Sequence, residues 1–211
     1  MRTLATSIAI ALLGGLAFFL VTEGFTAVTS EGARRLAVLR NPAPLPSLRL
    51  VDTRGEAVDL AQLSRDKDRV WIADFIYTRC LAVCNALGGS FQQLQKRIVA
   101  GKSGASVGLL SISFDPASDS REVLATYGQG LQADPARWRF VRVEQEAELP
   151  PLLDHFGVVV IPDGLGGFQH NAALHVIAGG KILRIFDYDQ ADAALAFALA
   201  RSAESAVNQS R

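Results

Sequence analysis

The sequence is poor in cysteine and has no net charge. It contains two cysteines in 211 residues, and its 21 lysines and arginines equal its 21 aspartates and glutamates. No run of five or six like charges occurs, which argues against a nucleic-acid surface, because such a surface needs a concentrated basic face. A disulfide between the two cysteines would close a very short loop and contribute only about 2 kcal/mol. Internal repeats and low-complexity segments are also lacking.

Hydrophobic residues, in contrast, are abundant. They make up 49% of the chain, enough for a sizeable core, and the length suits one domain plus an additional segment. A domain with so much core hardly needs a weak disulfide, so the cysteine pair is expected to serve chemistry rather than structure.

The additional segment lies at the N-terminus. Residues 3–22 carry no charge, and about 20 apolar residues in a helix span a bilayer. The segment is longer than the apolar part of most signal peptides and lacks a clear cleavage site, so an uncleaved anchor is favoured over a cleaved signal. We therefore predict an anchor or signal at 1–22, a stalk at 23–45, an exported domain at 46–205 and a tail at 206–211.

The first half of that domain reads as strands alternating with helices. A hairpin is expected at 48–63, a buried central strand at 70–77 and a second buried strand at 107–114. Between the two buried strands, four apolar residues share one helical face before the stop at Gly101: Leu87, Phe91, Leu94 and Ile98. Asp119 is expected to cap the next helix, with Glu122 three residues later.

The second half ends in an antiparallel pair and a helix. It is expected to contain a strand at 137–143, a helix at 148–157, a glycine-rich loop at 162–169, a hairpin of the strands 172–177 and 182–188, and a last helix at 189–203. This order predicts an α/β fold of the thioredoxin type, with a mixed central sheet flanked by helices.

Cys80 and Cys84 follow the first buried strand and open a predicted helix. The unpaired N–H groups and the dipole of a helix N-terminus stabilise thiolates there. Two soft thiolates select Cu(I) or zinc, but a lone CxxxC is equally compatible with a reversible disulfide.

A metal site needs a third ligand, and the chain has three histidines. His155 is expected at the surface, and His175 reads as a sheet residue. His170 closes the glycine-rich loop just before a strand that, in a thioredoxin fold, ends beside the helix carrying the cysteines. Its imidazole would complete a Cys₂His set with ligand types that suit copper.

Three segments resemble the Sco/SenC family of copper-binding thioredoxin-like proteins: DFIYTRCLAVCNALGGSFQQLQ, ISFDPASD and HNAALHVIAGGKILRIFDY. The resemblance covers roughly residues 45–190. It implies that one copper, as Cu(I), Cu(II) or both, is bound by Cys80, Cys84 and His170. Asn85 and Gln169 stand where the family commonly has proline and an acidic residue, and neither change removes a ligand.

The resemblance also implies partners and a location. The family helps to assemble the binuclear copper centre of cytochrome c oxidase, so the copper-bearing subunit of an oxidase, or another copper client, is the expected partner. A periplasmic thiol reductant or copper donor is a further one, and no nucleic acid is expected. The anchor then places the chain in the inner membrane with its domain in the periplasm.

Two functions remain open. A metallochaperone would bind and transfer copper without turnover, whereas a membrane-anchored thiol–disulfide oxidoreductase would use Cys80 and Cys84 as a redox pair. Disulfide exchange has no need of His170, so the chaperone is favoured over an enzyme. Asp74 supports the alternative, since it lies in a buried strand six residues before Cys80, where thioredoxin-like oxidoreductases carry a proton acceptor.

Overall fold

A computed structural model describes residues 2–22, 24, 28–65, 69–79, 83–101 and 106–209, with the backbone alone at 2, 83–87 and 208–209. The chain forms two compact units, Met1–Asn41 and Pro42–Arg211. The two are described separately below.

The first unit consists of two helices, α1 (Arg2–Val21) and α2 (Ser30–Arg40). α1 is long and apolar enough to cross a membrane, as an anchor or a signal sequence would be. The Thr29 hydroxyl caps α2 by accepting a 3.0 Å hydrogen bond from the Gly32 N–H, and Glu31 pairs with Arg34. α2 therefore lies within the segment that the sequence suggested as a stalk.

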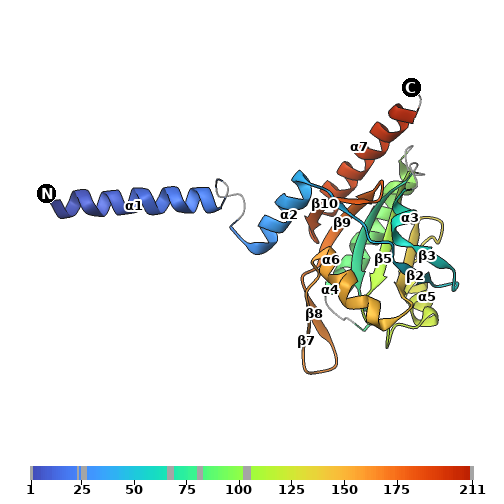
Figure 1. The fold of residues 1–211 in the computed structure, drawn as a ribbon. Coiled ribbons are helices and arrows are strands. Elements are labelled where there is room, and N and C mark those ends of the chain that lie inside the picture. The colour runs from blue at the N-terminus through green and yellow to red at the C-terminus, as the bar shows by residue number, and fades with distance from the viewer. Residues whose placement is uncertain are drawn as a thin grey trace. The chain divides into compact units, whose positions relative to one another are not determined.

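The second unit is built on one mixed sheet of eight strands (Figure 1). Its spatial order is β1-β10-β9-β4-β5-β6-β2-β3, and β4, β5 and β6 run parallel while the other pairs are antiparallel. The strands are β1 (Ala43–Pro44), β2 (Arg49–Asp52), β3 (Ala57–Asp59), β4 (Val70–Ile76), β5 (Val107–Ser113), β6 (Trp138–Val143), β9 (Ala173–Ala178) and β10 (Lys181–Asp187).

Burial explains why β4 and β5 occupy the centre. Every residue of both strands is buried, as expected for continuous apolar runs in parallel strands that are covered on both faces. The turn between β9 and β10 needs two residues with positive φ, and Gly179 and Gly180 supply them at 59° and 75°.

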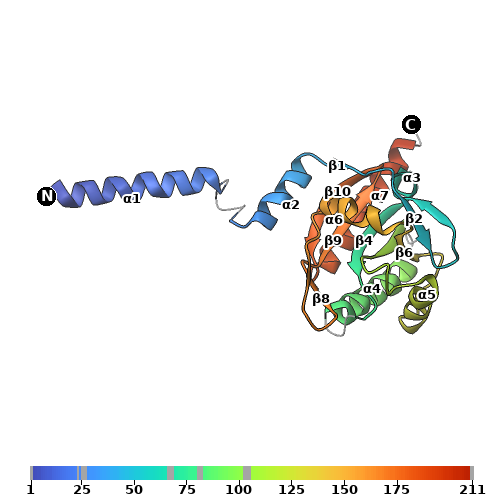
Figure 2. The same cartoon turned by 60° about the horizontal axis from the view of Figure 1, so that its bottom comes forward.

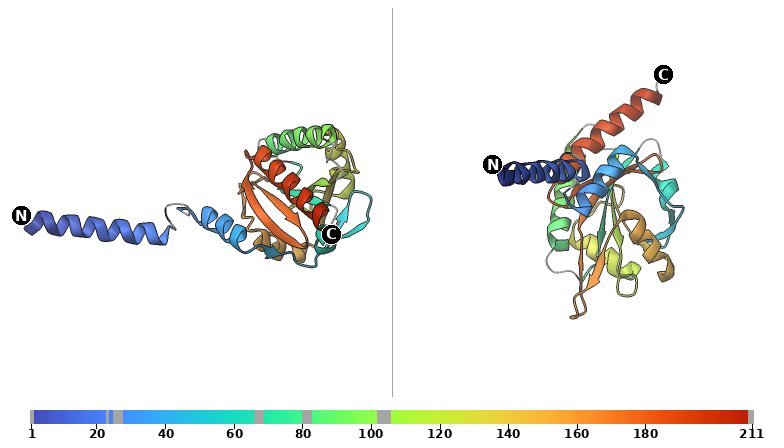
Figure 3. Two further views of the ribbon diagram at one scale, coloured as in Figure 1. Left: turned by 90° about the horizontal axis from the view of Figure 1, so that it is seen from above. Right: turned by 60° about the vertical axis from the view of Figure 1, so that its left-hand side comes forward.

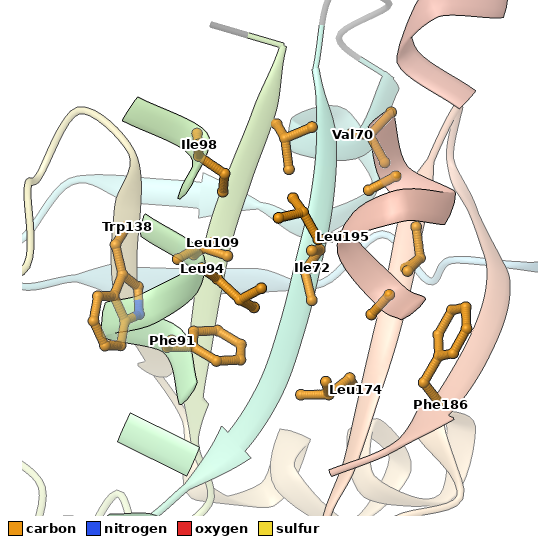
Figure 4. Packing of buried hydrophobic residues seen from close by; sticks show 14 of the residues in the cluster. Val70, Ile72, Phe91, Leu94, Ile98, Leu109, Trp138, Leu174, Phe186 and Leu195 are labelled. Carbon is orange, nitrogen blue, oxygen red and sulfur yellow. The ribbon is translucent and has the colours of Figure 1, made fainter. Parts of the chain in front are cut away.

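Helices cover both faces of the sheet. α4 (Val83–Ala100), α5 (Arg121–Gly130) and α7 (Ala191–Gln209) pack on one face (Figures 2 and 3). Their apolar residues form one cluster with Ile72, Leu109 and Trp138 of the sheet (Figure 4). On the other face, Phe156 of α6 (Leu149–Phe156) packs edge-on against Phe75, with ring centroids 5.0 Å apart. A mixed sheet flanked by helices confirms the predicted fold class.

Two local predictions need correction. The expected hairpin at 48–63 ends at Asp59, and a short helix, α3 (Leu60–Arg65), follows it. The glycine-rich segment 162–169 is the end of a second small sheet, in which β7 (Val160–Pro162) pairs with β8 (Phe168–His170). This hairpin projects beyond the end of the large sheet at which α4 begins (Figure 1).

Candidate metal centre

The cysteine segment joins β4 to α4. β4 ends at Ile76, and residues 77–79 lead into Cys80. Cys80 lies outside the described residues. Cys84 is the second residue of α4, and its side chain is likewise outside the described part. The backbone therefore puts Cys84 in the first helical turn, where the sequence suggested it, and the meeting of the two sulfurs stays a prediction.

Thr78 is held by Asp119, a residue that lies beyond the end of β5. The Thr78 hydroxyl donates to Asp119 Oδ1 at 2.6 Å, and the Thr78 N–H lies 3.2 Å from Oδ2. The Ser113 hydroxyl adds a further hydrogen bond to Oδ2, at 2.6 Å. The fully buried Asp119 thus fixes the chain two residues before Cys80.

This role corrects the expected helix cap. Ser120, not Asp119, caps α5 by accepting a hydrogen bond from the Val123 N–H at 3.3 Å. Burial raises the pKa of Asp119 despite the hydrogen bonds that it accepts, and the neighbouring Asp115 carboxylate adds to the rise.

Arg79 immediately precedes Cys80 in the sequence. Its guanidinium donates to the buried Asp115 carboxylate at 2.8 Å, and half of its side chain remains exposed.

Asp74 is buried in β4, as the sequence suggested. It lies on the same strand face as Ile72 and Ile76, whose side chains belong to the cluster beneath α4. Ser111, its register partner on β5, hydrogen-bonds its carboxylate and accepts a 2.9 Å hydrogen bond from Trp138 Nε1. Asp74 Oδ1 has no hydrogen-bond partner among the described residues, and burial raises the pKa of this carboxyl to about 7.

His170 is the last residue of β8 and is partly buried. Its ring packs against Phe114, with centroids 5.0 Å apart and an angle of 62° between the planes. Both ring nitrogens are buried, and neither finds a hydrogen-bond partner in the part of the chain that the structure describes. Desolvation lowers the pKa of His170, so the imidazole is neutral near pH 7, the form that binds a metal.

Each of the other two histidines makes a hydrogen bond to the backbone of another element. His175 is fully buried in β9, with Nε2 3.2 Å from the Phe156 carbonyl oxygen, which confirms it as a sheet residue. His155 is half-buried in α6 and hydrogen-bonds the Pro44 backbone, so the expectation of a surface position is wrong.

Among the described side chains, no three His, Cys, Asp or Glu residues form a cluster that could hold a metal ion. A site at His170 therefore depends on the cysteines, whose side chains are not among them. Sequence reasoning missed Tyr77, Phe114 and Thr78, which surround the cysteine segment or His170. The only signal was their place beside the motif or at the end of a buried strand.

Comparison with known proteins identifies the family of this chain. A family model described as SCO1/SenC matches residues 41–204, which is most of the chain. The chain belongs to the SCO1/SenC family. The SCO1 protein homolog of Bacillus subtilis is 28% identical over 138 residues, covering 64% of this chain and 68% of that protein.

Solved structures of Sco proteins share the fold. BsSco, described as a member of the Sco family of cytochrome c oxidase assembly proteins with a disulfide switch, superposes with a TM-score of 0.66. That pair is 22% identical, and the match covers 77% of this chain and 95% of BsSco. Copper-bound ScoI from Bradyrhizobium japonicum gives a TM-score of 0.61 at 22% identity, over 74% of this chain and 99% of ScoI.

Proposed function

We propose that this Sco protein binds one copper ion through Cys80, Cys84 and His170 and delivers it to the copper-bearing subunit of a cytochrome c oxidase. The observation that carries the proposal is the His170 ring, which is buried, neutral and without a described hydrogen-bond partner. A buried imidazole normally satisfies its nitrogens, and a metal ion would do so here. Family membership and the copper-bound ScoI structure support the same cargo.

Each ligand would have a distinct task. The two thiolates hold Cu(I) by themselves, whereas the imidazole completes a set that also accepts Cu(II). Copper is bound by thiolates, and a disulfide contains no thiolate, so copper loading requires the reduced cysteine pair. Release to a client would follow when the client's ligands replace these three one at a time. We place the domain in the periplasm, with α1 as the anchor in the inner membrane.

Copper titration tests this proposal. The reduced chain should bind about one copper, and very little once Cys80 and Cys84 are oxidised. His170→Ala should weaken Cu(II) binding by about tenfold or more and Cu(I) binding less, with disulfide exchange nearly unchanged. His155→Ala is the matched control and should bind like the parent. Equal uptake by reduced and oxidised protein, or parental binding by His170→Ala, would contradict the ligand set.

Asp74 favours a second function, reduction of a client disulfide. In that reaction one thiolate attacks a client sulfur and expels the client's other thiolate, and the second cysteine then displaces the first client sulfur. The client gains two electrons, and this chain is left with a disulfide that a thiol reductant must restore. A carboxyl with a pKa of about 7 can take the proton from the attacking thiol near neutral pH.

A further inference from the structure

The Tyr77 side chain makes two hydrogen bonds to the backbone of one residue, Phe168. Its hydroxyl donates to the Phe168 carbonyl oxygen at 3.0 Å and accepts from the Phe168 N–H at 3.1 Å. A phenolic hydroxyl can donate and accept at once, so it pairs both the N–H and the carbonyl oxygen of Phe168, as a neighbouring strand would. Tyr77 is 5% exposed, which shields both bonds from water.

These bonds connect the two parts of the proposed copper site. Tyr77 immediately follows β4 and stands three residues before Cys80. Phe168 begins β8 and stands two residues before His170. β8 pairs with β7, and Val160 lies opposite His170 in this pair. The Tyr77 hydroxyl bonds to the backbone of β8 from outside the hairpin.

Aromatic packing surrounds the same contact. The Tyr77 ring meets Phe168 edge-on, with centroids 5.3 Å apart, and lies 5.2 Å from Phe114. Phe114 in turn contacts the ring of His170 at 5.0 Å. The His170 ring has no described hydrogen bond to orient it, so its position depends on this packing and on the backbone of β8.

The base of the hairpin has a separate fastening. The Asn171 side chain accepts from the Val159 N–H at 2.6 Å and donates to the Gly157 carbonyl oxygen at 2.9 Å. These bonds fix Asn171, the residue after His170, whereas Tyr77 fixes Phe168, two residues before His170. The Tyr77 contact joins β8 to the segment that leads into Cys80.

We propose that Tyr77 is a positioning residue whose hydroxyl holds β8 so that the His170 imidazole faces the copper site. The inference rests on the proposed function, because it assigns a task to His170 as a ligand. The hydroxyl acts through the Phe168 backbone, so its loss should affect Cu(II), which needs the imidazole, more than Cu(I), which the thiolates retain.

Tyr77→Phe tests the proposal, since it removes the hydroxyl and keeps the ring. The full-length chain in mild detergent would carry the change, with Tyr188→Phe at the 47% exposed Tyr188 as the control. In the copper-free protein, exchange of the Phe168 amide hydrogen should accelerate by about tenfold, because its acceptor is gone. Cu(II) affinity should fall by about three- to tenfold, with smaller changes for Cu(I) and for the rate of disulfide reduction.

The outcomes separate this inference from the proposed function. Unchanged exchange at Phe168 would overturn the inference alone. Faster exchange with parental Cu(II) affinity would also overturn it, provided that His170→Ala weakens binding in the same assay. If His170→Ala binds copper like the parent, the ligand set fails and the positioning role fails with it.

Discussion

At the scale of single residues, burial favours the uncharged form of two groups with opposite chemistry. It raises the pKa of the Asp74 carboxyl to about 7 and lowers the pKa of the His170 imidazole. Near neutral pH the imidazole is therefore free of its second proton, and Asp74 is balanced between its two forms. The carboxyl can therefore exchange a proton near neutral pH, and the imidazole is in the neutral form, the form in which histidine binds metals.

Asp74→Asn should change how stability depends on pH. The Asp74 pKa is about 7 in the folded state and near 3.8 in the unfolded chain, so the folded state binds more protons between these values. The parent therefore loses stability as pH rises from about 4 to about 7, by on the order of a few kcal/mol, and then levels off. Asparagine does not titrate, so the stability of Asp74→Asn relative to the parent should increase over the same pH range. Urea denaturation at several pH values measures this.

The exposed Asp189 provides the matched control, because Asp189→Asn makes the same chemical change at a surface position. Alkylation of Cys80 and Cys84 adds a test of function. If Asp74 exchanges protons with the pair, Asp74→Asn should shift the pH profile of alkylation. An unchanged profile would remove the main support for the oxidoreductase.

At the scale of elements, each of the three residues that follow β4 is held by a hydrogen bond to another part of the chain. Tyr77 bonds to β8, Thr78 to Asp119 and Arg79 to Asp115. Three consecutive residues before Cys80 thus contact three other positions of the chain. Residues 77–79 are therefore fixed by contacts outside their own segment.

Two neighbouring variants distinguish this anchoring from ordinary helix capping. Ser120→Ala should cost about 1 kcal/mol of stability through loss of the α5 cap, with parental copper affinity. Asp119→Asn should cost about 1–3 kcal/mol, because an amide nitrogen replaces one of two accepting oxygens, and should also weaken copper binding. Urea denaturation and copper titration of both proteins make the comparison. If the two lose stability but bind copper equally well, Asp119 has no role in the site.

The sequence predicted elements where a single period dominates. The run 70–77 and the face formed by Phe91, Leu94 and Ile98 correspond to β4 and α4. The β7–β8 hairpin escaped prediction because its strands have three residues each and carry no readable period. Long-range bonds from Tyr77 and within the hairpin base stabilise it, and such bonds leave no local pattern.

The residues of the candidate site could likewise be predicted only in part. His170 could be told from His175 by its place after a glycine-rich loop rather than inside an alternating strand. Asp119 could not be assigned, since aspartate and serine are both good caps and the choice depends on Thr78, 41 positions away. The residues that we propose as ligands could be named from the sequence, whereas the residues that hold the neighbouring backbone, such as Asp119, could not.

At the scale of the whole molecule, α1 should decide where the protein is found. The full chain should sediment with membranes, whereas a chain beginning at residue 30 should be soluble and bind copper like the parent, because residues 42–211 form their own compact unit. Fractionation and copper titration measure the two properties. Intact full-length chain in the soluble fraction would contradict an anchor, and a mature N-terminus near residue 31 would show cleavage instead.

The two outer strands of the large sheet are its shortest. β1 has two residues and β3 has three, and Pro44 in β1 has no N–H to offer. A long exposed edge would let a second copy add its own strand, the first step towards aggregation. The short outer strands of this sheet therefore leave little free edge to which a second copy could add a strand.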